Sequence, residues 1–286
     1  MPSVGRTPYT LGMAKGATQM TTPDLTSFDV LLLNSSAGKD SQTMIDEVVK
    51  LADAAGVRDR IVVVHCDLGR AEWEGTADLA KAQADHYGLR FEIVRRPQGD
   101  LLAQIEARGM FPSSAARYCT SDQKTGQVAR LMTQLVKEQR EALGTTRRIR
   151  ILNMLGIRAQ ESSARAKKEA LGLEKKASNG KREVVRWLPI FDWTEDEVWA
   201  SIKATGVPYH AAYDAGMPRL SCAFCVLASR SALVLSAQLN PALAQQYVEL
   251  EERIDHRFTN TTSMAEIVNE AKTATAPVCV ENWGAC

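Results

Sequence analysis

The fold is decided by one stretch, Val30-Leu31-Leu32-Leu33-Asn34-Ser35-Ser36-Ala37-Gly38-Lys39-Asp40-Ser41. Its apolar half predicts a strand at 28–34, and apolar residues recur at helical spacing from Met44 to Ala52. The small turn between these two elements is suited to phosphate, because backbone N–H groups converge there and the helix N-terminus adds partial positive charge. Lys39 adds a full charge, and three serines add hydroxyl groups.

Two common phosphate-loop patterns do not match this turn. The Walker A pattern requires a Gly five residues before Gly38, where Leu33 stands, and a Ser or Thr after Lys39, where Asp40 stands. The turn also lacks the Gly-x-Gly-x-x-Gly dinucleotide pattern. The residues alone leave two interpretations open: a phosphate cradle, or a tight turn with a Ser cap on the next helix.

The following segments alternate between strand and helix. Residues 61–64 are a β-branched run typical of a parallel strand buried on both faces, 72–87 is predicted helical, and 91–94 is a third strand. This order predicts an α/β fold with a doubly wound, mostly parallel, Rossmann-like sheet and right-handed crossovers. Ligands of such sheets lie beyond the carboxyl ends of the strands, where the 34–41 loop and the turn at 65–69 are expected.

The second half of the chain is predicted to add further elements. We expect a short helix from Asp100, a loop at 112–121, a helix capped by Ser121, strands at 149–155 and 187–191, and helices at 194–205, 241–258 and 263–271. A flexible basic excursion is expected at 174–182. Thr194 and Glu197 form a capping-box pattern.

Composition divides the chain into three regions. Residues 1–27 lack periodicity and are expected to be a mobile tail, 28–205 an α/β domain, and 206–286 a helical C-terminal region containing Cys222-x-x-Cys225. The formal net charge of +1 argues against a polyelectrolyte binder, and no apolar run approaches membrane-spanning length. Without a signal-peptide pattern, a cytoplasmic compartment is expected, in which six cysteines indicate metal or redox chemistry rather than disulfides.

A basic stretch surrounds the exit of the fourth expected strand. Between Arg147 and Arg186 there are 12 Lys or Arg and 4 Asp or Glu, a local net charge of +8. Arg158, Glu161 and Arg165 leave the strand end together. Two guanidiniums there can grip a phosphate while Glu161 orients one of them. A solvated basic loop is the alternative interpretation.

Four motifs occur in order along the chain. They are Ser36-x-Gly38-x-Asp40-Ser41; Arg117-Tyr118-Cys119 with Lys124; Gly156-x-Arg158-x-x-Glu161-Ser162-x-x-Arg165; and Trp187 to Cys225, which holds Asp-Trp-Thr-Glu-x-x-Val-Trp, Pro-Tyr, Tyr-x-x-Gly and Arg-x-x-Cys-x-x-Cys. Together they resemble the PAPS reductase-like family of PP-loop ATP pyrophosphatases, which have the adenine nucleotide alpha hydrolase-like fold. The resemblance spans about residues 28–226.

The resemblance implies an adenine nucleotide such as ATP, bound over the 34–41 loop with Mg²⁺. The implied nucleotide-binding residues are Ser35, Ser36, Ala37, Gly38, Lys39, Asp40, Ser41, Asp67 and Gly156. Asp40 suits Mg²⁺ by oxygen ligation. Asp67 either faces the nucleotide, which we favour, or caps a turn. Cleavage between the α- and β-phosphates needs electrostatic clamping, and the implied catalytic residues are Lys39, Asp40, Lys124, Arg158, Glu161 and Arg165.

Three cysteines are implied metal ligands. Cys119 matches a ligand position of the family, and Cys222-x-x-Cys225 has the spacing of a metal site. We expect a [4Fe–4S] cluster; the alternatives are a structural Zn²⁺, with His210 or another Cys as fourth ligand, and inert buried cysteines. Cys66 is expected to be packed and inert.

Two departures separate the chain from the reductases of this family. Reductases with a cluster carry a Cys-Cys pair, but Thr120 follows Cys119 here. The reductases also carry a Glu-Cys-Gly-Leu-His-type nucleophile near the C-terminus, whereas this chain ends on Trp283-Gly284-Ala285-Cys286. Both departures place reductase activity in doubt.

The first functional expectation is therefore an ATP pyrophosphatase that forms AMP and pyrophosphate and activates a target for sulfur transfer. In this it most resembles the component of bacterial DNA phosphorothioation systems (the DndC/SspD type). The resemblance implies a cysteine desulfurase and other modification-system proteins as partners, leaves DNA possible, and gives no reason to expect a membrane. The alternatives are an assimilatory PAPS or adenylylsulfate reductase using Cys286, and a nucleotide-binding scaffold without turnover.

Overall fold

Six strands form one sheet in the computed structural model, which describes residues 22–275. The strands are β1 (Val30–Ser35), β2 (Ile61–Asp67), β3 (Arg90–Arg95), β4 (Ile149–Leu155), β5 (Leu171–Leu173) and β6 (Arg182–Trp187). They lie in the order β3-β2-β1-β4-β6-β5. Only β5 is antiparallel to its neighbour within this sheet. The expected doubly wound, mostly parallel sheet is confirmed.

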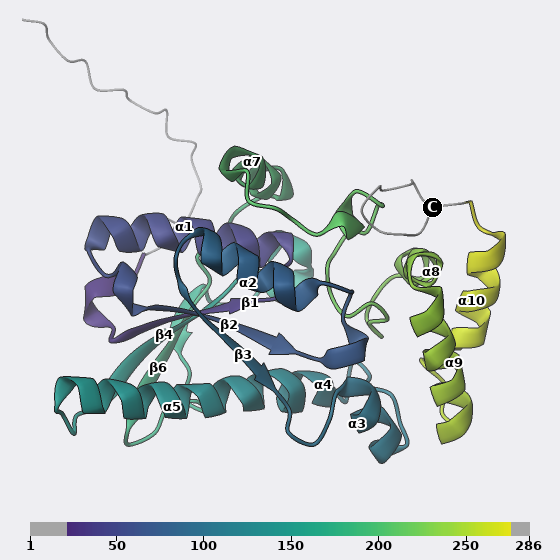
Figure 1. The fold of residues 1–286 in the computed structure, drawn as a ribbon, viewed down its shortest axis with the longest axis horizontal. Helices are drawn as coiled ribbons and strands as arrows, with labels where there is room; N and C mark the ends of the chain where they lie inside the picture. The colour runs from purple at the N-terminus through teal and green to yellow at the C-terminus, as the bar shows by residue number, and fades with distance from the viewer. Residues whose placement is uncertain (1–21, 276–286) are drawn as a thin grey trace, which may run out of the picture.

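Helices cover both faces of the sheet, and further helices pack beside one of its ends. They are α1 (Lys39–Ala55), α2 (Thr76–His86), α3 (Leu101–Arg108), α4 (Tyr118–Thr120), α5 (Gly126–Leu143), α6 (Ser163–Ala166), α7 (Glu195–Thr205), α8 (Arg230–Leu239), α9 (Pro241–Ile254) and α10 (Met264–Thr273). Helices α1 and α2 lie on one face and α5 lies on the other (Figure 1). Because both faces are covered, the central strands are continuous apolar runs.

The central strand β1 contributes to two apolar cores. Leu31 and Leu33 pack into the core shared with α1, whereas Val30 and Leu32 pack into the core shared with α5. This division follows from the alternation of side chains along a strand. Since every second residue serves each core, the apolar stretch at 30–33 holds the two helical layers together.

The sheet order creates a switch point at β1 and β4. From β1 the chain runs outward through β2 and β3, then returns to β4 on the other side of β1. Ligands of open α/β sheets bind at such a point, beyond the carboxyl ends of the strands. The 34–41 loop leaves β1 there, and the 156–165 segment leaves β4 beside it.

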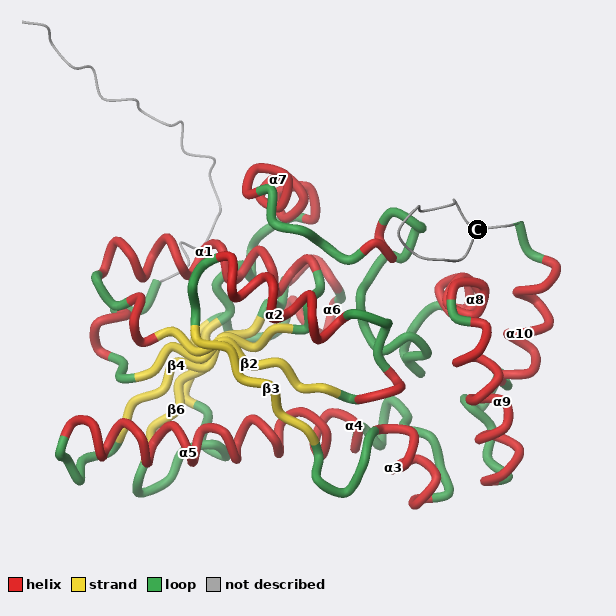
Figure 2. Tube along the Cα trace, in the orientation of Figure 1, coloured by secondary structure: helices red, strands yellow, loops and turns green. Residues whose placement is uncertain are grey.

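The C-terminal helices α8, α9 and α10 pack together beside the end of the sheet (Figure 2). Their core includes Phe224, Tyr247 and Phe258, and it continues into Leu68 and Trp73 after β2. The expected helical C-terminal region is confirmed.

Several expected boundaries are wrong, each for a local reason. The last strand ends at Trp187 rather than beginning there, because the apolar Leu188 and Ile190 are buried in a turn. The expected excursion at 174–182 ends in the first residue of that strand. Helix α2 begins only after Gly75, which has a positive φ of 75°. Helix α8 was not predicted.

Ser121 does not cap a helix, because it lies inside a helical run that begins at Tyr118. The loop expected at 112–121 therefore ends earlier, before Tyr118. The capping box of Thr194 with Glu197 is confirmed.

Within the expected tail, Leu25–Ser27 forms a short 3-10 turn with Leu25 buried. Cys286 lies outside the described residues. Within residues 22–275, no helix has the length and apolar character needed to cross a bilayer.

Candidate active site

The 34–41 loop is held in shape by its own serines. The Ser41 hydroxyl accepts a hydrogen bond from the Ser36 N–H at 3.2 Å and donates one to the Gly38 carbonyl at 2.9 Å. Gly38 precedes the first turn of α1 and supplies no side-chain cap to that helix end. Apart from the Lys39 N–H, which Tyr213 binds, this helix N-terminus is available to an anionic ligand.

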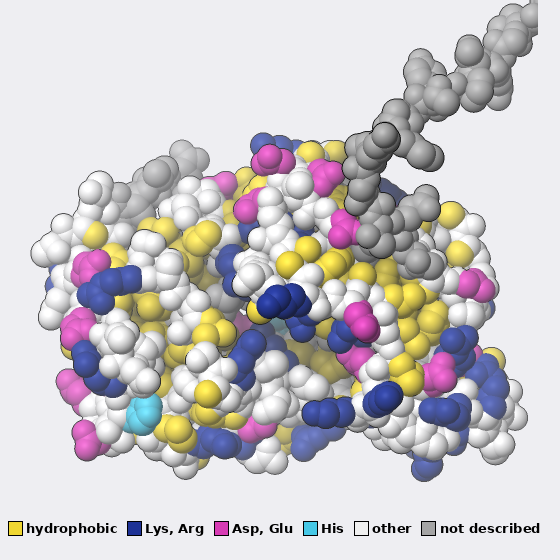
Figure 3. Space-filling view, turned by 180° about the vertical axis from the view of Figure 1, so that it is seen from behind, with side chains coloured by type: hydrophobic (Ala, Val, Ile, Leu, Met, Phe, Trp, Pro, Cys, Tyr) yellow, Lys and Arg dark blue, Asp and Glu magenta, His cyan; other side chains and the backbone are white. Residues whose placement is uncertain are grey.

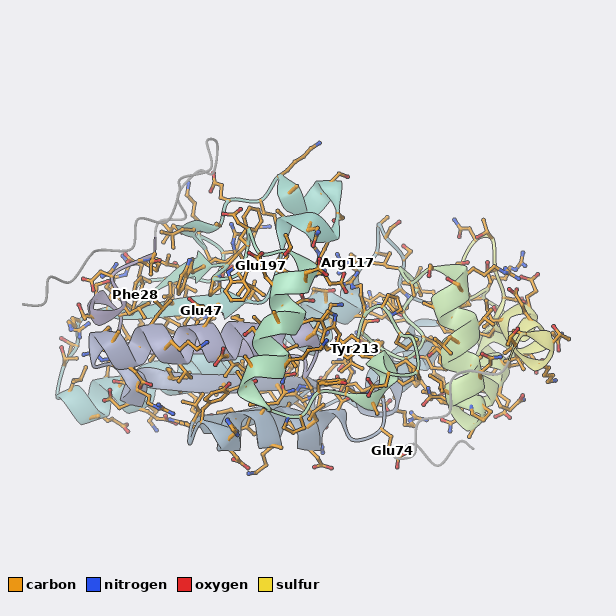
Figure 4. All side chains as sticks on the ribbon, turned by 90° about the horizontal axis from the view of Figure 1, so that it is seen from above. Phe28, Glu47, Glu74, Arg117, Glu197 and Tyr213 are labelled. Atoms are coloured by element: carbon orange, nitrogen blue, oxygen red, sulfur yellow. The ribbon has the colours of Figure 1, made fainter. Side chains whose placement is uncertain are left out.

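Tyr213 braces this loop from the C-terminal region. Its hydroxyl accepts hydrogen bonds from the N–H groups of Lys39, at 2.9 Å, and Leu220, at 3.3 Å. Burial raises the pKa of Tyr213 to about 12, so the hydroxyl stays neutral. Figure 4 labels Tyr213 at the junction between the sheet and the C-terminal helices. The site prediction did not include it, although it is the Tyr of the Tyr-x-x-Gly motif.

The exit of β4 presses against the first turn of α1. A Cβ atom on Gly156 would lie 2.7 Å from the Asp40 carbonyl oxygen and 2.8 Å from the Ser41 nitrogen. The next residues reinforce the contact, because the buried Arg158 donates from Nε to Asp40 Oδ1 at 2.5 Å. Arg158 therefore fixes the Asp40 carboxylate rather than facing a ligand.

Glu161 organises two further arginines. It forms ion pairs with Arg165 and, at 3.7 Å, with Arg219, and it accepts a hydrogen bond from the Arg158 N–H at 2.9 Å. Arg165 and Arg219 both line a cavity beside the loop. Arg219 was not a predicted site residue, although it is the Arg of the Arg-x-x-Cys-x-x-Cys motif.

Lys124 enters the same cavity from a π-helical turn, Ser121–Thr125. Such wide turns are frequent at functional sites because they re-aim a side chain. Burial lowers the pKa of Lys124, but the acidic groups of Cys222, Glu72 and their neighbours outweigh it, and the pKa is raised overall. Lys124 is therefore a cation in the cavity wall.

The cavity has a volume of about 440 Å³ and two chemically different parts. One part is polar and comprises the 34–41 loop with Lys124, Arg165 and Arg219. The other part is apolar and is lined by Val64, Val128, Met132 and Leu155. A hollow with Lys and Arg side chains around it is visible near the middle of the molecule in Figure 3. The cavity has the size and lining of a small-molecule site, with room for a base and for phosphate.

A buried histidine also lines the cavity, and the site prediction did not include it. His65 Nδ1 lies 3.1 Å from the Ser35 carbonyl, and Nε2 lies 3.2 Å from Glu72 Oε2. Since both partners are acceptors, the doubly protonated ring satisfies both. Burial lowers the pKa of His65, but the hydrogen bond and charge of Glu72 outweigh this effect, so the pKa is raised.

Six predicted site residues do not line the cavity, namely Ala37, Lys39, Asp67, Arg158, Cys119 and Cys225. The Lys39 ammonium lies 2.6 Å from the Pro218 carbonyl and 3.2 Å from Glu195. Asp67 accepts a hydrogen bond from the Gly69 N–H at 2.7 Å and pairs with Arg95. These contacts match the alternative interpretation, in which the Asp67 carboxylate caps a turn, and a role of Asp67 toward a nucleotide stays a prediction. A role for Lys39 as a phosphate clamp has no support in this geometry.

The three predicted metal-ligand cysteines lie in one region but not as a ligand set. Burial raises the pKa of Cys222 to about 12, and the nearby Lys124 cation, which lowers this pKa, only partly offsets the effect. Within residues 22–275, no three His, Cys, Asp or Glu side chains are arranged to hold a metal ion. The thiols suit iron or zinc by type, and the expected metal site stays a prediction from the sequence.

His210, the predicted alternative zinc ligand, points both ring nitrogens at backbone groups. Its Nδ1 accepts a hydrogen bond from the Ala212 N–H, and its Nε2 lies 3.2 Å from the Glu74 carbonyl. Burial raises the pKa of Cys66 to about 11, as expected for a packed thiol.

The chain is similar to several known proteins. An adenosine 5'-phosphosulfate reductase of Allochromatium vinosum is 31% identical over 172 residues, which are 59% of this chain and 59% of that protein. The match thus spans less than two thirds of that relative's length.

Among solved structures, a PAPS reductase of Candida auris in a phosphate complex is 18% identical with a TM-score of 0.45, covering 69% of this chain and 83% of that one. A U34-tRNA thiolase of Methanococcus maripaludis with its [4Fe–4S] cluster is 13% identical with a TM-score of 0.42, covering 88% and 74%.

A family model describes the larger part of the chain. The model of the phosphoadenosine phosphosulfate reductase domain matches residues 30–228. This range includes the 34–41 loop, the π-helical turn, the exit of β4 and Cys222-x-x-Cys225. The chain therefore belongs to the phosphoadenosine phosphosulfate reductase domain family.

Proposed function

We propose that the cavity binds ATP and that the chain cleaves it between the α- and β-phosphates to activate an acceptor for sulfur transfer. One observation carries this proposal. A single cavity joins the N-terminus of α1, three cationic side chains and an apolar wall. The apolar wall suits the adenine base, and the polar part suits the triphosphate.

The residues of the polar part would act by position and charge. The first turn of α1 would hold phosphate oxygens by its N–H groups. Lys124 faces the loop from the α5 side, while Glu161 holds Arg165 and Arg219 on the other side. Negative charge that develops on the departing pyrophosphate would be stabilised by these fixed cations.

Mg²⁺ fits this arrangement through Asp40. Its carboxylate lines the cavity, and Arg158 contacts only one of its two oxygens. Because Mg²⁺ is commonly held by one or two carboxylates and the substrate phosphates, a three-carboxylate cage is not required. The ion would neutralise part of the negative charge of the phosphates.

For the acceptor we propose a phosphate group of DNA, with a cysteine desulfurase as the sulfur source. In support, Cys222 lines the cavity and could receive sulfur close to the activated group. Thr120 also lines the cavity, at the position where reductases with a cluster carry a second Cys. A [4Fe–4S] cluster stays a prediction from the sequence, and iron content with visible absorbance of anaerobically purified protein tests it.

Reduction of adenosine 5'-phosphosulfate is a second candidate function. It is favoured by the name of the Allochromatium vinosum relative. The same cavity would then hold a sulfate-bearing nucleotide. A thiol would take its sulfo group with AMP as the leaving group, and a second thiol would release sulfite as the two thiols form a disulfide. The two candidates differ in their products, which are pyrophosphate and sulfite.

Product analysis separates the two candidates. Purified protein is incubated with Mg²⁺ and ATP, alone and with DNA, a cysteine desulfurase and cysteine, and pyrophosphate is measured. Parallel reactions contain either sulfonucleotide with a dithiol, and sulfite is measured. We expect pyrophosphate, at least about tenfold less from Arg165→Ala because a charge-assisted phosphate contact is lost, and unchanged release from the exposed control Lys168→Ala. Sulfite without pyrophosphate would replace the first candidate with the second.

A further inference from the structure

A second hollow lies between α5 and the turn that leads into β6. It is a groove of about 670 Å³. The charged residues that line it are five cations and one acid: Arg130, Lys137, Arg140, Lys181, Arg182 and Glu141. Thr133, Gln134 and Asn179 add neutral polar groups. The groove is therefore strongly electropositive in a chain whose formal net charge is only +1.

Arg182 gives the groove a buried positive charge. Only 8% of this residue is exposed. Its guanidinium donates to the carbonyls of Ala177 and Ala129 and to the Thr133 hydroxyl, at 2.8 to 3.1 Å. No Asp or Glu among residues 22–275 forms an ion pair with it, and burial lowers its pKa. A buried guanidinium without a carboxylate partner favours an anion beside it.

The groove adjoins the candidate active site. Ala129 and Ala177, which accept the hydrogen bonds from Arg182, both line the nucleotide cavity. The groove continues along α5 from Arg130 to Arg140, which is about 15 Å at 1.5 Å per residue. One strand of a duplex places about four phosphates along that length, at about 3.4 Å each.

We propose that this groove binds the phosphate backbone of a nucleic-acid strand and leads it to the nucleotide cavity. The described residues that line it include no aromatic side chain, and Val136 is the one apolar residue, whereas the centre of a protein interface is rich in such anchors. Lys, Arg, Thr, Gln and Asn are the usual donors to phosphate. The inference rests on the proposed function, because it names the acceptor that the activated nucleotide would meet.

Figure 3 agrees with this charge distribution. In the view from behind, Lys and Arg side chains gather over the lower right of the molecule. The local net charge of +8 that the sequence places at 147–186 contributes Lys181 and Arg182 to the groove. The other three cations come from α5, so the fold assembles the groove from two segments.

A charge-matched pair of variants tests the groove. The first combines Arg130→Ala, Lys137→Ala and Lys181→Ala, which are exposed groove residues. The control combines Lys81→Ala, Lys203→Ala and Lys272→Ala, which are exposed on α2, α7 and α10. Both variants lose three positive charges. Binding of a fluorescein-labelled 20-mer DNA, single- and double-stranded, is measured by anisotropy at several salt concentrations.

We expect the groove variant to bind DNA at least tenfold more weakly than the control variant. Its slope of log affinity against log salt should fall by about two, since each lost phosphate contact in a single strand contributes about 0.7. ATP binding without DNA should be unchanged in both variants, so a failure of the groove to bind DNA can be distinguished from a failure of the proposed function.

Equal DNA affinity of the two variants would overturn the inference. Displacement of DNA from the wild type by poly-glutamate at equal charge concentration would also overturn it, in favour of an acidic protein partner.

Discussion

Arg158 and Arg165 leave the same strand end but have different surroundings. Arg158 is 3% exposed and holds Asp40, whereas Arg165 pairs with Glu161 and lines the cavity. A buried guanidinium with a carboxylate partner supports the loop, and a cavity-lining one can meet a ligand. Spacing in the motif brings both residues to the site, but the packing of each side chain decides its role.

Tyr213→Phe should weaken both the fold and nucleotide binding. The change leaves the N–H groups of Lys39 and Leu220 without their shared acceptor, which costs about 1–3 kcal/mol for a buried group. Urea unfolding measures the stability, and equilibrium dialysis with ATP measures the affinity. Tyr209→Phe is the control, because that hydroxyl contacts Asp214 at an exposed position. Equal behaviour of the two variants would remove Tyr213 from the site.

The stability of the protein should depend on the protonation of His65. Its pKa is raised in the folded state, so the stabilisation is fully present below the unfolded value of about 6.5 and is lost as the pH rises through the folded value. Urea unfolding from pH 6 to pH 9 should show this loss in the wild type and less of it in His65→Gln. The half-buried His256→Gln should keep the wild-type profile. Identical profiles for the wild type and His65→Gln would contradict the charged, doubly bonded imidazole.

Among the elements, the unit β1–α1–β4 carries the site, and much of it could be predicted. The apolar run at 30–33 and the helical spacing after it indicate both elements, because burial on two faces leaves a clear pattern. The β5–β6 hairpin and α8 could not be predicted so well. In β6, three charged and three apolar residues follow one another without a regular alternation inside a basic stretch, and tertiary packing alone distinguishes it from a loop.

Gly156→Ala should disrupt the contact between β4 and α1. The new Cβ would meet backbone atoms at 2.7 and 2.8 Å, and backbone cannot move aside as a flexible side chain does. We expect a loss of about 1–3 kcal/mol in unfolding free energy, typical of overpacking, together with weaker ATP binding. Gly180→Ala is the matched control, since a Cβ there meets no atom within 4 Å. A Gly156→Ala protein with wild-type stability would show that the two backbones are not in contact.

At the scale of the whole molecule, the cavity combines segments that are far apart in the sequence. The motif residues Lys124 and Arg165 were found from the sequence because each lies within a recognisable spacing. His65 and Tyr213 were not, since their roles depend on contacts with Ser35 and Lys39 that only the fold creates. The cysteines show the opposite case, in which a good spacing predicts a ligand set that the described arrangement does not contain.

Hydrogen–deuterium exchange with saturating nucleotide tests the central claim, that an adenine nucleotide lies in this cavity with its phosphates on the 34–41 loop. The protein is compared alone, with Mg²⁺ and a non-hydrolysable ATP analogue, and with adenosine 5'-phosphosulfate. We predict slower exchange in segments 34–42, 120–129 and 156–165 with at least one nucleotide, and unchanged exchange in α9 and α10. Unchanged exchange in those three segments with both nucleotides, or protection confined to other parts of the chain, would contradict the account.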